Sequence, residues 1–173
     1  MLKEGDYIEG KIKIYEGEKL LLEDKILTKL GSGLYNKEIE NNLIGKEGEK
    51  IELEFDENNN PFGKRNPKNI VIVPAKVFRE NRLIPIPGLV VNMDGKTGIV
   101  LTVNSDRVLV DFNHPLAGKK IKIIIEDIKK LDRKEFLEKL AQNLGYKDVI
   151  EEKDGQLIIK SKILESLVQR FSL

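Results

Sequence analysis

The sequence has no cysteine and no tryptophan, and His114 is its single histidine. Without cysteine the chain cannot form a disulfide scaffold or use a thiolate as a nucleophile. A zinc site built from His and Cys needs several such ligands, so this kind of metal site is excluded as well. We therefore expect the protein to work without a metal or another cofactor.

The chain also lacks a large excess of positive or negative charge, and it has no long apolar run. The 173 residues carry 30 basic and 29 acidic side chains, which gives a net charge of +1. This balance provides no general attraction to nucleic acids or membrane surfaces. No apolar stretch approaches the roughly 18–20 residues of a membrane span, and the start "MLKEGDY" lacks the apolar run of a signal peptide. We expect a cytoplasmic protein that binds neither nucleic acid nor membrane.

The common catalytic motifs are absent too. The sequence contains no GxxxxGK[ST] phosphate loop, and no GxSxG nucleophile elbow accompanies His114. Any catalysis by this chain is therefore expected to act through shape and hydrogen bonds rather than through a covalent intermediate.

The patterns that are present are mainly those of β-strands. Five segments are predicted as strands outside residues 89–112: 6–14, 19–24, 50–55, 69–73 and 119–128. The segments "DYIEGKIKI" and "KIELEF" alternate apolar and polar residues, which is the period of a half-buried strand. A short helix is expected to contain Ile39, Leu43 and Ile44 and to end at Gly45. The turn-rich segment 56–67 is predicted to be a loop.

A second group of short strands lies between Leu89 and Phe112. The pieces "LVVNM", "GIVLTV" and "RVLVDF" are strand-like, and "MDGKTG" and "NSD" separate them as turn sequences. These patterns predict a small all-β module inside a β-rich body.

The last part of the chain has a helical character. Asp132 is a predicted N-cap with Glu135 three residues on, the pattern of a capping box. An apolar helical stripe follows, then a hairpin centred on Asp154-Gly155, and then a second amphipathic helix over 163–171. An αββα unit of this size is near the limit below which a core is inadequate. We expect it to dock on the rest of the chain or on a partner.

The segment "VLVDFNHPLAGKKIKI", residues 108–123, joins two predicted strands through the chain's only histidine. Asn and Asp side chains bond to the local backbone, Pro fixes φ, and Gly adopts conformations that other residues avoid. We therefore predict that His114 serves in a turn. A pH-sensing or metal-binding role is the alternative.

This segment resembles the motif that closes the insert-in-flap (IF) domain of SlyD-type FK506-binding proteins (FKBPs), which are peptidyl-prolyl isomerases and chaperones. The stretches "LGSGLYNKEIENNLIGKEGEK" and "NPFGKRNPKNIVIVPAKVF" are similar to stretches that occur in the same order in that family. The resemblance covers the chain up to Leu131. Beyond it, the chain resembles the C-terminal extension of long archaeal FKBPs.

The resemblance implies an α+β fold with three parts. An FKBP-like antiparallel sheet with a short helix would occupy residues 1–73 plus 120–130. An inserted all-β IF domain would occupy 74–119, and a small αββα C-terminal unit would occupy 131–173.

The resemblance also implies where the isomerase groove would lie. Its positions fall in this sequence at Ile12, Leu22, Glu23, Asp24, Tyr35, Asn36, Phe62 and Ile123. The acidic position is Glu23 or Asp24, depending on the register. In the family, aromatic side chains line this groove, and most of them are replaced here. Two interpretations stay open: these residues fill the core of a retired site, or weak isomerase activity survives.

The IF domain of the family captures unfolded chains on an exposed apolar surface. The corresponding candidates for peptide binding are Ile84, Ile86, Leu89, Val90, Ile99 and Leu101. Strand alternation would turn about half of such residues inward. The implied function is a folding chaperone for unfolded or proline-containing polypeptides, with weakened or lost isomerase activity. The alternative is a non-catalytic peptide-binding or assembly module that docks, or forms a homodimer, through its C-terminal extension.

Overall fold

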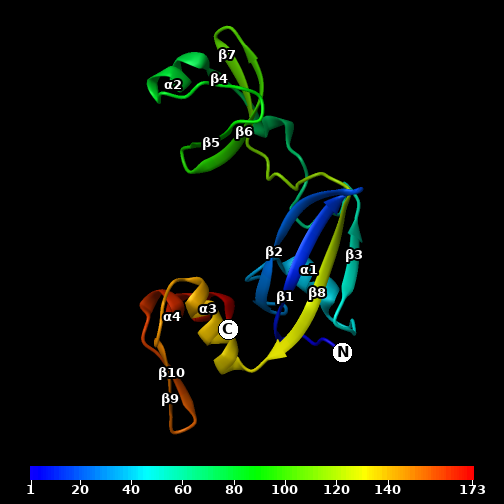
Figure 1. Cartoon of the computed structure of the whole chain (residues 1–173), viewed down its shortest axis with the longest axis vertical. Coiled ribbons are helices and arrows are strands. Elements are labelled where there is room, and N and C mark those ends of the chain that lie inside the picture. The colour runs from blue at the N-terminus through cyan, green and yellow to red at the C-terminus, as the bar shows by residue number, and fades with distance from the viewer. The chain divides into compact units, whose positions relative to one another are not determined.

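The computed structural model describes residues 1–173, and the chain divides into two compact units. The first unit contains residues 1–56 and 120–173, and the second contains residues 57–119 (Figure 1). None of the helices combines the length and the apolar character needed to cross a membrane. Each unit has its own antiparallel sheet and is described separately.

The sheet of the first unit contains four strands in the order β2-β1-β8-β3. Their bounds are Tyr7–Glu16 (β1), Lys19–Lys29 (β2), Ile51–Phe55 (β3) and Ile121–Leu131 (β8). Every neighbouring pair is antiparallel. In β3 buried and exposed residues alternate strictly, as the sequence pattern predicts for a strand with one covered face.

The register places one row of aliphatic residues on the same face of this sheet. Ile12 lies opposite Ile125, and Ile14 lies opposite Ile123. Directly opposed residues of an antiparallel pair point to the same side. All four side chains are fully buried, so this face is the core of the unit.

Helix α1 (Lys37–Leu43) covers this face, and its start is fixed by the side chain of Asn36. Asn36 Oδ1 accepts hydrogen bonds from the backbone N–H groups of Glu38 and Ile39, both at 3.1 Å. An Asn at this position satisfies N–H groups that have no partner within the helix. Ile39 and Leu43, one turn apart, are fully buried.

The same helix carries a buried carboxylate that organises the loop before it. Glu40 has no exposed surface and accepts a hydrogen bond of 2.6 Å from the Thr28 hydroxyl. It also accepts bonds from the backbone N–H groups of Gly31, Gly33 and Tyr35, at 3.1, 2.8 and 3.1 Å. A buried carboxylate persists only when its oxygens are satisfied in this way. Glu40 therefore ties α1 to β2 and fixes the loop between them.

The opposite face of the sheet carries the C-terminal elements. They are α3 (Arg133–Asn143), β9 (Ile150–Lys153), β10 (Gln156–Ile159) and α4 (Lys162–Phe171). Asp132 Oδ1 accepts the N–H of Glu135 at 2.8 Å, which confirms the predicted N-cap of α3. The predicted hairpin is confirmed as the pairing of β9 with β10.

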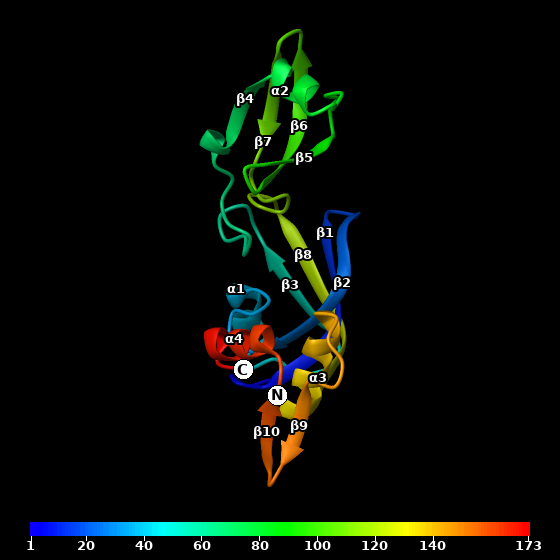
Figure 2. The same ribbon diagram turned by 90° about the vertical axis from the view of Figure 1, so that its left-hand side faces the viewer.

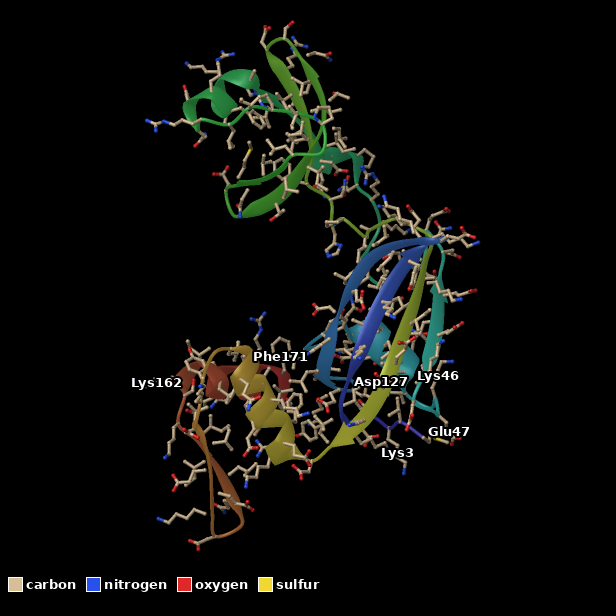
Figure 3. The ribbon with its side chains drawn as sticks, in the orientation of Figure 1. Lys3, Lys46, Glu47, Asp127, Lys162 and Phe171 are labelled. Carbon is tan, nitrogen blue, oxygen red and sulfur yellow. The ribbon has the colours of Figure 1, made fainter.

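The C-terminal helices share one apolar core with the sheet. Phe136, Leu137 and Leu164 are fully buried, and Tyr7 and Leu27 from β1 and β2 pack against them. The rings of Tyr7 and Phe136 lie 4.8 Å apart between centroids. Helix α3 runs beside β1 and β2, and α4 ends at Phe171 in the same cluster (Figure 2 and Figure 3). Residues 131–173 are thus part of the first unit, because their core is incomplete without the sheet.

The second unit has a sheet of four strands in the order β4-β7-β6-β5. Their bounds are Ile70–Pro74 (β4), Val90–Met93 (β5), Lys96–Asn104 (β6) and Arg107–Asp111 (β7). A short 3-10 helix, η1 (Pro67–Asn69), precedes β4, and helix α2 (Ala75–Glu80) follows it. Phe78 and Ala75 of α2 pack on Val91, Val100, Val108 and Val110 from one face of the sheet.

Two features of this unit differ from the sequence predictions. The unit begins at residue 57 rather than 74, because β4 pairs with β7 and so belongs to the second sheet. The unit is also not all-β, because α2 supplies Phe78 to its core. The helix has only six residues, too few for an apolar period to be recognised in the sequence.

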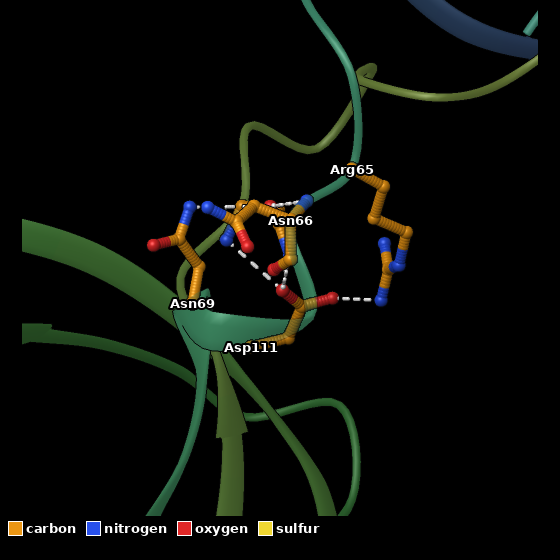
Figure 4. A network of polar contacts seen from close by, with 5 residues as sticks. Arg65, Asn66, Asn69 and Asp111 are labelled. Carbon is orange, nitrogen blue, oxygen red and sulfur yellow. Dashed lines mark hydrogen bonds and ion pairs between the residues drawn. The ribbon is translucent and has the colours of Figure 1, made fainter.

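A polar network closes the second unit where its two chain ends meet (Figure 4). Asp111 is buried, pairs with Arg65, and accepts hydrogen bonds from the backbone and side-chain N–H groups of Asn113 at 2.9 and 2.8 Å. Asn113 in turn accepts the N–H of Asn66 at 2.8 Å. Asn60 donates to the carbonyls of Leu116 and Lys119 at 2.7 and 2.9 Å. These bonds join residues 60–66, at the start of the unit, to residues 111–119, at its end.

His114 belongs to a turn in this closure, as predicted. Its Nδ1 accepts the backbone N–H of Leu116 at 3.1 Å, and its carbonyl accepts the N–H of Ala117 at 3.0 Å. Burial lowers the pKa of His114, so its ring is neutral at pH 7 and can accept this bond. The turn role explains the sequence motif without any reactive histidine.

The Glu40 network generates a first prediction. Replacing Glu40 with Gln puts an NH2 group where N–H and O–H donors now point, so we expect a loss of at least about 2 kcal/mol in the free energy of unfolding. Urea denaturation would measure it. Glu38→Gln on the exposed side of the same helix is the matched control and should change stability by less than about 0.5 kcal/mol. Equal effects of the two substitutions would contradict the structural role of Glu40.

A second prediction concerns pH. Burial alone would raise the pKa of Asp111, but the hydrogen bonds from Asn113 and the charge of Arg65 outweigh burial, so the pKa lies below its ordinary 3.8. A carboxyl whose pKa is lower in the folded state stabilises the fold above the unfolded pKa, and this contribution disappears as the pH falls through the folded pKa. The difference in unfolding free energy between wild type and Asp111→Asn should be constant from about pH 7 to 5 and shrink below about pH 4. A difference that does not vary with pH would rule out this role for the charge.

Candidate functional site

Two of the predicted groove positions are isoleucines in the core of the first unit. Ile12 on β1 and Ile123 on β8 both have 0% exposed surface. They occupy neighbouring rows of the register on the face that α1 covers. Side chains with no accessible surface contact only the protein itself, so these two residues are core residues in this structure. This favours the interpretation that the groove floor has been filled.

The strand register decides which acidic residue shares this face. Asp24 lies opposite Ile12, whereas Glu23 lies opposite Lys13. Because neighbouring residues of a strand point to opposite sides, Asp24 lies on the same face as Ile12 and Glu23 lies on the other face. Leu22, opposite Ile14, is half-buried on the same side as Asp24. Of the two acidic candidates, Asp24 is therefore the one on the face of Ile12 and Ile14.

Tyr35 brings an aromatic ring to the same region from the loop before α1. Burial of Tyr35 raises the pKa of its hydroxyl, and the negative charge of Asp24 raises it further. The hydroxyl is therefore protonated at neutral pH and able to donate a hydrogen bond. The pair of Asp24 and Tyr35 gives the unit an acceptor and a donor near the groove floor. Asn36, the next residue, uses its side chain as the cap of α1.

Phe62 belongs to the second unit, whereas the other predicted groove positions belong to the first. Its ring stacks on the imidazole of His114, with centroids 4.9 Å apart and planes inclined by 12°. Its aromatic ring supports the turn at His114.

The predicted peptide-binding residues of the second unit fall into two classes. Ile84, Ile86 and Val90 are 81, 56 and 63% exposed. Leu89, Ile99 and Leu101 are half-buried, and Leu89 packs against the core of the unit. Of the six, Leu89 is the one that packs against the core, whereas Ile99 pairs with Val90 on the side of the sheet away from α2.

The second unit also exposes apolar residues that the sequence analysis did not single out. Ile72 of β4 is 60% exposed and lies opposite Leu109, on the side of the sheet away from α2. Val90 and Ile99 form a cross-strand pair on the same side. The alternation in "NIVIV" is the signal that could have identified Ile72, since Val71 and Val73 lie on the other face.

Glu40 was likewise missed, although the sequence contained a signal for it. The helix period places residue 40 three positions before Leu43 and so on the buried side of α1.

No three or more His, Asp or Glu side chains gather closely enough to hold a metal ion.

Comparisons with known proteins agree with this architecture. A family model described as "FKBP26, IF domain" matches residues 71–116. A probable FKBP-type 16 kDa peptidyl-prolyl cis-trans isomerase of Pseudomonas fluorescens is 35% identical over 109 residues, covering 60% of this chain and 72% of the relative.

Two further relatives have the same kind of name. A short-type peptidyl-prolyl cis-trans isomerase of Methanocaldococcus jannaschii is 27% identical over 145 residues, covering 73% of this chain and 92% of the relative. An FKBP-type 16 kDa isomerase of Escherichia coli K12 is 31% identical over 105 residues, covering 58% of this chain and 70% of the relative. The chain belongs to the FKBP-type peptidyl-prolyl cis-trans isomerase family and carries an IF domain.

Proposed function

We propose that this protein is a folding helper in which the binding of unfolded chains by the second unit outweighs prolyl isomerisation by the first. One observation carries the proposal. The second unit exposes large aliphatic side chains, such as Ile84 at 81%, whereas Ile12 and Ile123, at predicted groove positions of the first unit, are fully buried. Exposed apolar residues are the feature that captures unfolded polypeptides. The IF domain assignment supports the same division of labour.

Weak isomerase activity fits the groove that remains. Rotation of a prolyl bond crosses a barrier of about 18–20 kcal/mol, and catalysis needs an apolar surface that desolvates the imide together with a few hydrogen bonds. The Tyr35 hydroxyl and the Asp24 carboxylate supply polar groups near the floor. Ile12 and Ile123 are aliphatic and fully buried, so they offer the imide no aromatic wall.

A second candidate function is assembly through the C-terminal elements, without catalysis. Ile163 of α4 is 57% exposed, and Leu144 and Ile158 are 41 and 42% exposed. These residues favour a contact with a partner or a second copy of the chain. The oligomeric state at micromolar concentration, measured by analytical ultracentrifugation for wild type and Ile163→Ser, tests this alternative.

The groove generates a prediction on catalysis. We expect kcat/KM for an unstructured prolyl peptide to be at least about tenfold below that of an ordinary family member, which equals about 1.4 kcal/mol of barrier. A protease-free isomerisation assay measures it, and Asp24→Asn should lower the remaining activity while Glu23→Gln, on the opposite face, should not. Full activity in the wild type would contradict the sealed-groove interpretation.

The second unit generates a prediction on client binding. Phe55 and Ile121 are directly paired, so a short loop can join β3 to β8 in place of residues 57–119. We expect this variant to stay folded by circular dichroism and to lose most of its ability to suppress aggregation of a denatured protein. In the full chain, Ile84→Ser with Ile86→Ser should weaken protection without lowering stability, because both residues are exposed. A folded deletion variant that still protects the client as well as the full chain would show that binding occurs elsewhere.

A further inference from the structure

The face of the second sheet that α2 covers also carries an open groove, which we call the α2 groove. Its volume is about 840 Å³. Its apolar floor consists of Val71, Val73, Val77, Leu83, Met93 and Phe112. These residues come from β4, from α2 and the loop after it, from β5 and from the segment after β7. The groove is large enough for several side chains of an extended peptide.

The α2 groove exists because α2 is too short to cover its sheet. The six residues of the helix place Phe78 over the centre of the sheet, where it is fully buried. Towards β4, Val71 remains 38% exposed, and Leu83 beyond the helix remains 40% exposed. These side chains are apolar and accessible, so they favour an occupant that is itself apolar at its centre.

The rim of the groove is polar and carries more positive than negative charge. Lys68 stands on η1 and Lys96 at the start of β6, and Asp94 in the turn before β6 is the only acidic lining residue. Neither lysine forms an ion pair within the protein, whereas Lys76 pairs with Glu80 and Arg65 with Asp111 in the same unit. The two rim ammonium groups are thus available to an external carboxylate.

The charge of the rim continues through the whole second unit. Its basic residues are Lys64, Arg65, Lys68, Lys76, Arg79, Arg82, Lys96, Arg107 and Lys119, and its acidic residues are Glu57, Glu80, Asp94, Asp106 and Asp111. The unit therefore carries +4, which leaves −3 for the first unit, given +1 for the chain. A field of this sign raises the encounter rate with acidic segments.

A nucleic acid is a poorer match for this groove than a polypeptide. Single strands bind by stacking their bases on exposed aromatic rings. Phe112 is the only aromatic lining residue, and it is half-buried against the core. The aliphatic floor instead matches aliphatic or aromatic side chains of an unfolded chain.

We propose that the α2 groove selects client segments in which apolar residues are flanked by Asp or Glu. The floor holds the apolar side chains, and Lys68 and Lys96 pair with the flanking carboxylates. This proposal rests on the proposed binding of unfolded chains by the second unit and adds a charge preference to it. Segments flanked by Lys or Arg meet the same rim with repulsion.

Three labelled peptides test the proposal with the full-length protein. All share one extended apolar centre, and the flanks are Glu, Gln or Lys. Each exposed ion pair changes Kd by a factor of up to about five. We expect fluorescence anisotropy at about 50 mM salt to show the Glu peptide binding about fivefold more tightly than the Gln peptide, with the Lys peptide weakest. The preference should shrink at about 500 mM salt, because exposed charges are then screened.

Two charge-matched variants locate the preference. Lys68→Glu with Lys96→Glu changes the rim, whereas Lys64→Glu with Arg107→Glu makes the same change in net charge at exposed residues that do not line the groove. We expect the first variant to reverse the order of the Glu and Lys peptides and the second to retain the wild-type order. Thermal unfolding confirms that both variants fold.

Each other outcome overturns the proposal in a distinguishable way. Equal affinity for the three peptides would show that the charge preference is wrong while leaving the proposed function in place. Equal effects of the two variants would show that the charge preference does not depend on Lys68 and Lys96. Binding of no peptide by the wild type would refute the proposed function itself. Displacement of the Glu peptide by a single-stranded oligonucleotide at similar concentration would identify a nucleic-acid site instead.

Discussion

The pairing of β8 with both β1 and β3 holds the first unit together. Its register sets Ile123 opposite Ile14 and Leu53, and Ile125 opposite Ile12 and Ile51, which builds the core that α1 covers. The same strand follows the second unit in the chain and leads directly into α3. The sheet core, the insertion and the C-terminal elements therefore all depend on one strand, and a register slip in it would turn every buried isoleucine toward the other face.

The two units differ in how much of their apolar surface they bury. In the first unit, a continuous aliphatic core gives stability but leaves Ile12 and Ile123 with no surface for a ligand. Asp24 and Tyr35 are polar residues of the same unit, near enough for the charge of Asp24 to raise the pKa of the Tyr35 hydroxyl. In the second unit, a short helix leaves the sheet half-covered, so apolar surface remains accessible on both faces. The second unit thus keeps apolar surface accessible, and this is the unit to which we expect clients to bind.

The sequence predicted local features better than those that depend on distant contacts. The Asp132 cap and the hairpin at Asp154-Gly155 follow from a few neighbouring residues, and the structure contains both. The membership of β4 in the second sheet depends on pairing with β7, which no local pattern reports. The helix period could have indicated that Glu40 is buried, but its partners, Thr28 and the loop before α1, are set by the tertiary fold. The choice between Glu23 and Asp24 likewise required the register.

The network that closes the second unit has a consequence for the order of folding. The side chain of Asn60 bonds to the carbonyls of Leu116 and Lys119, and Gly118 N–H bonds to Gly63, so the unit joins its own two ends. All strand pairings of this unit lie within residues 57–119, whereas Phe55 must find Ile121 across the whole insertion. The entropy lost in closing a loop grows with the length of flexible chain in it. An insertion that folded before the first unit would replace that long flexible loop with a short one and would lower the entropy cost of pairing β3 with β8.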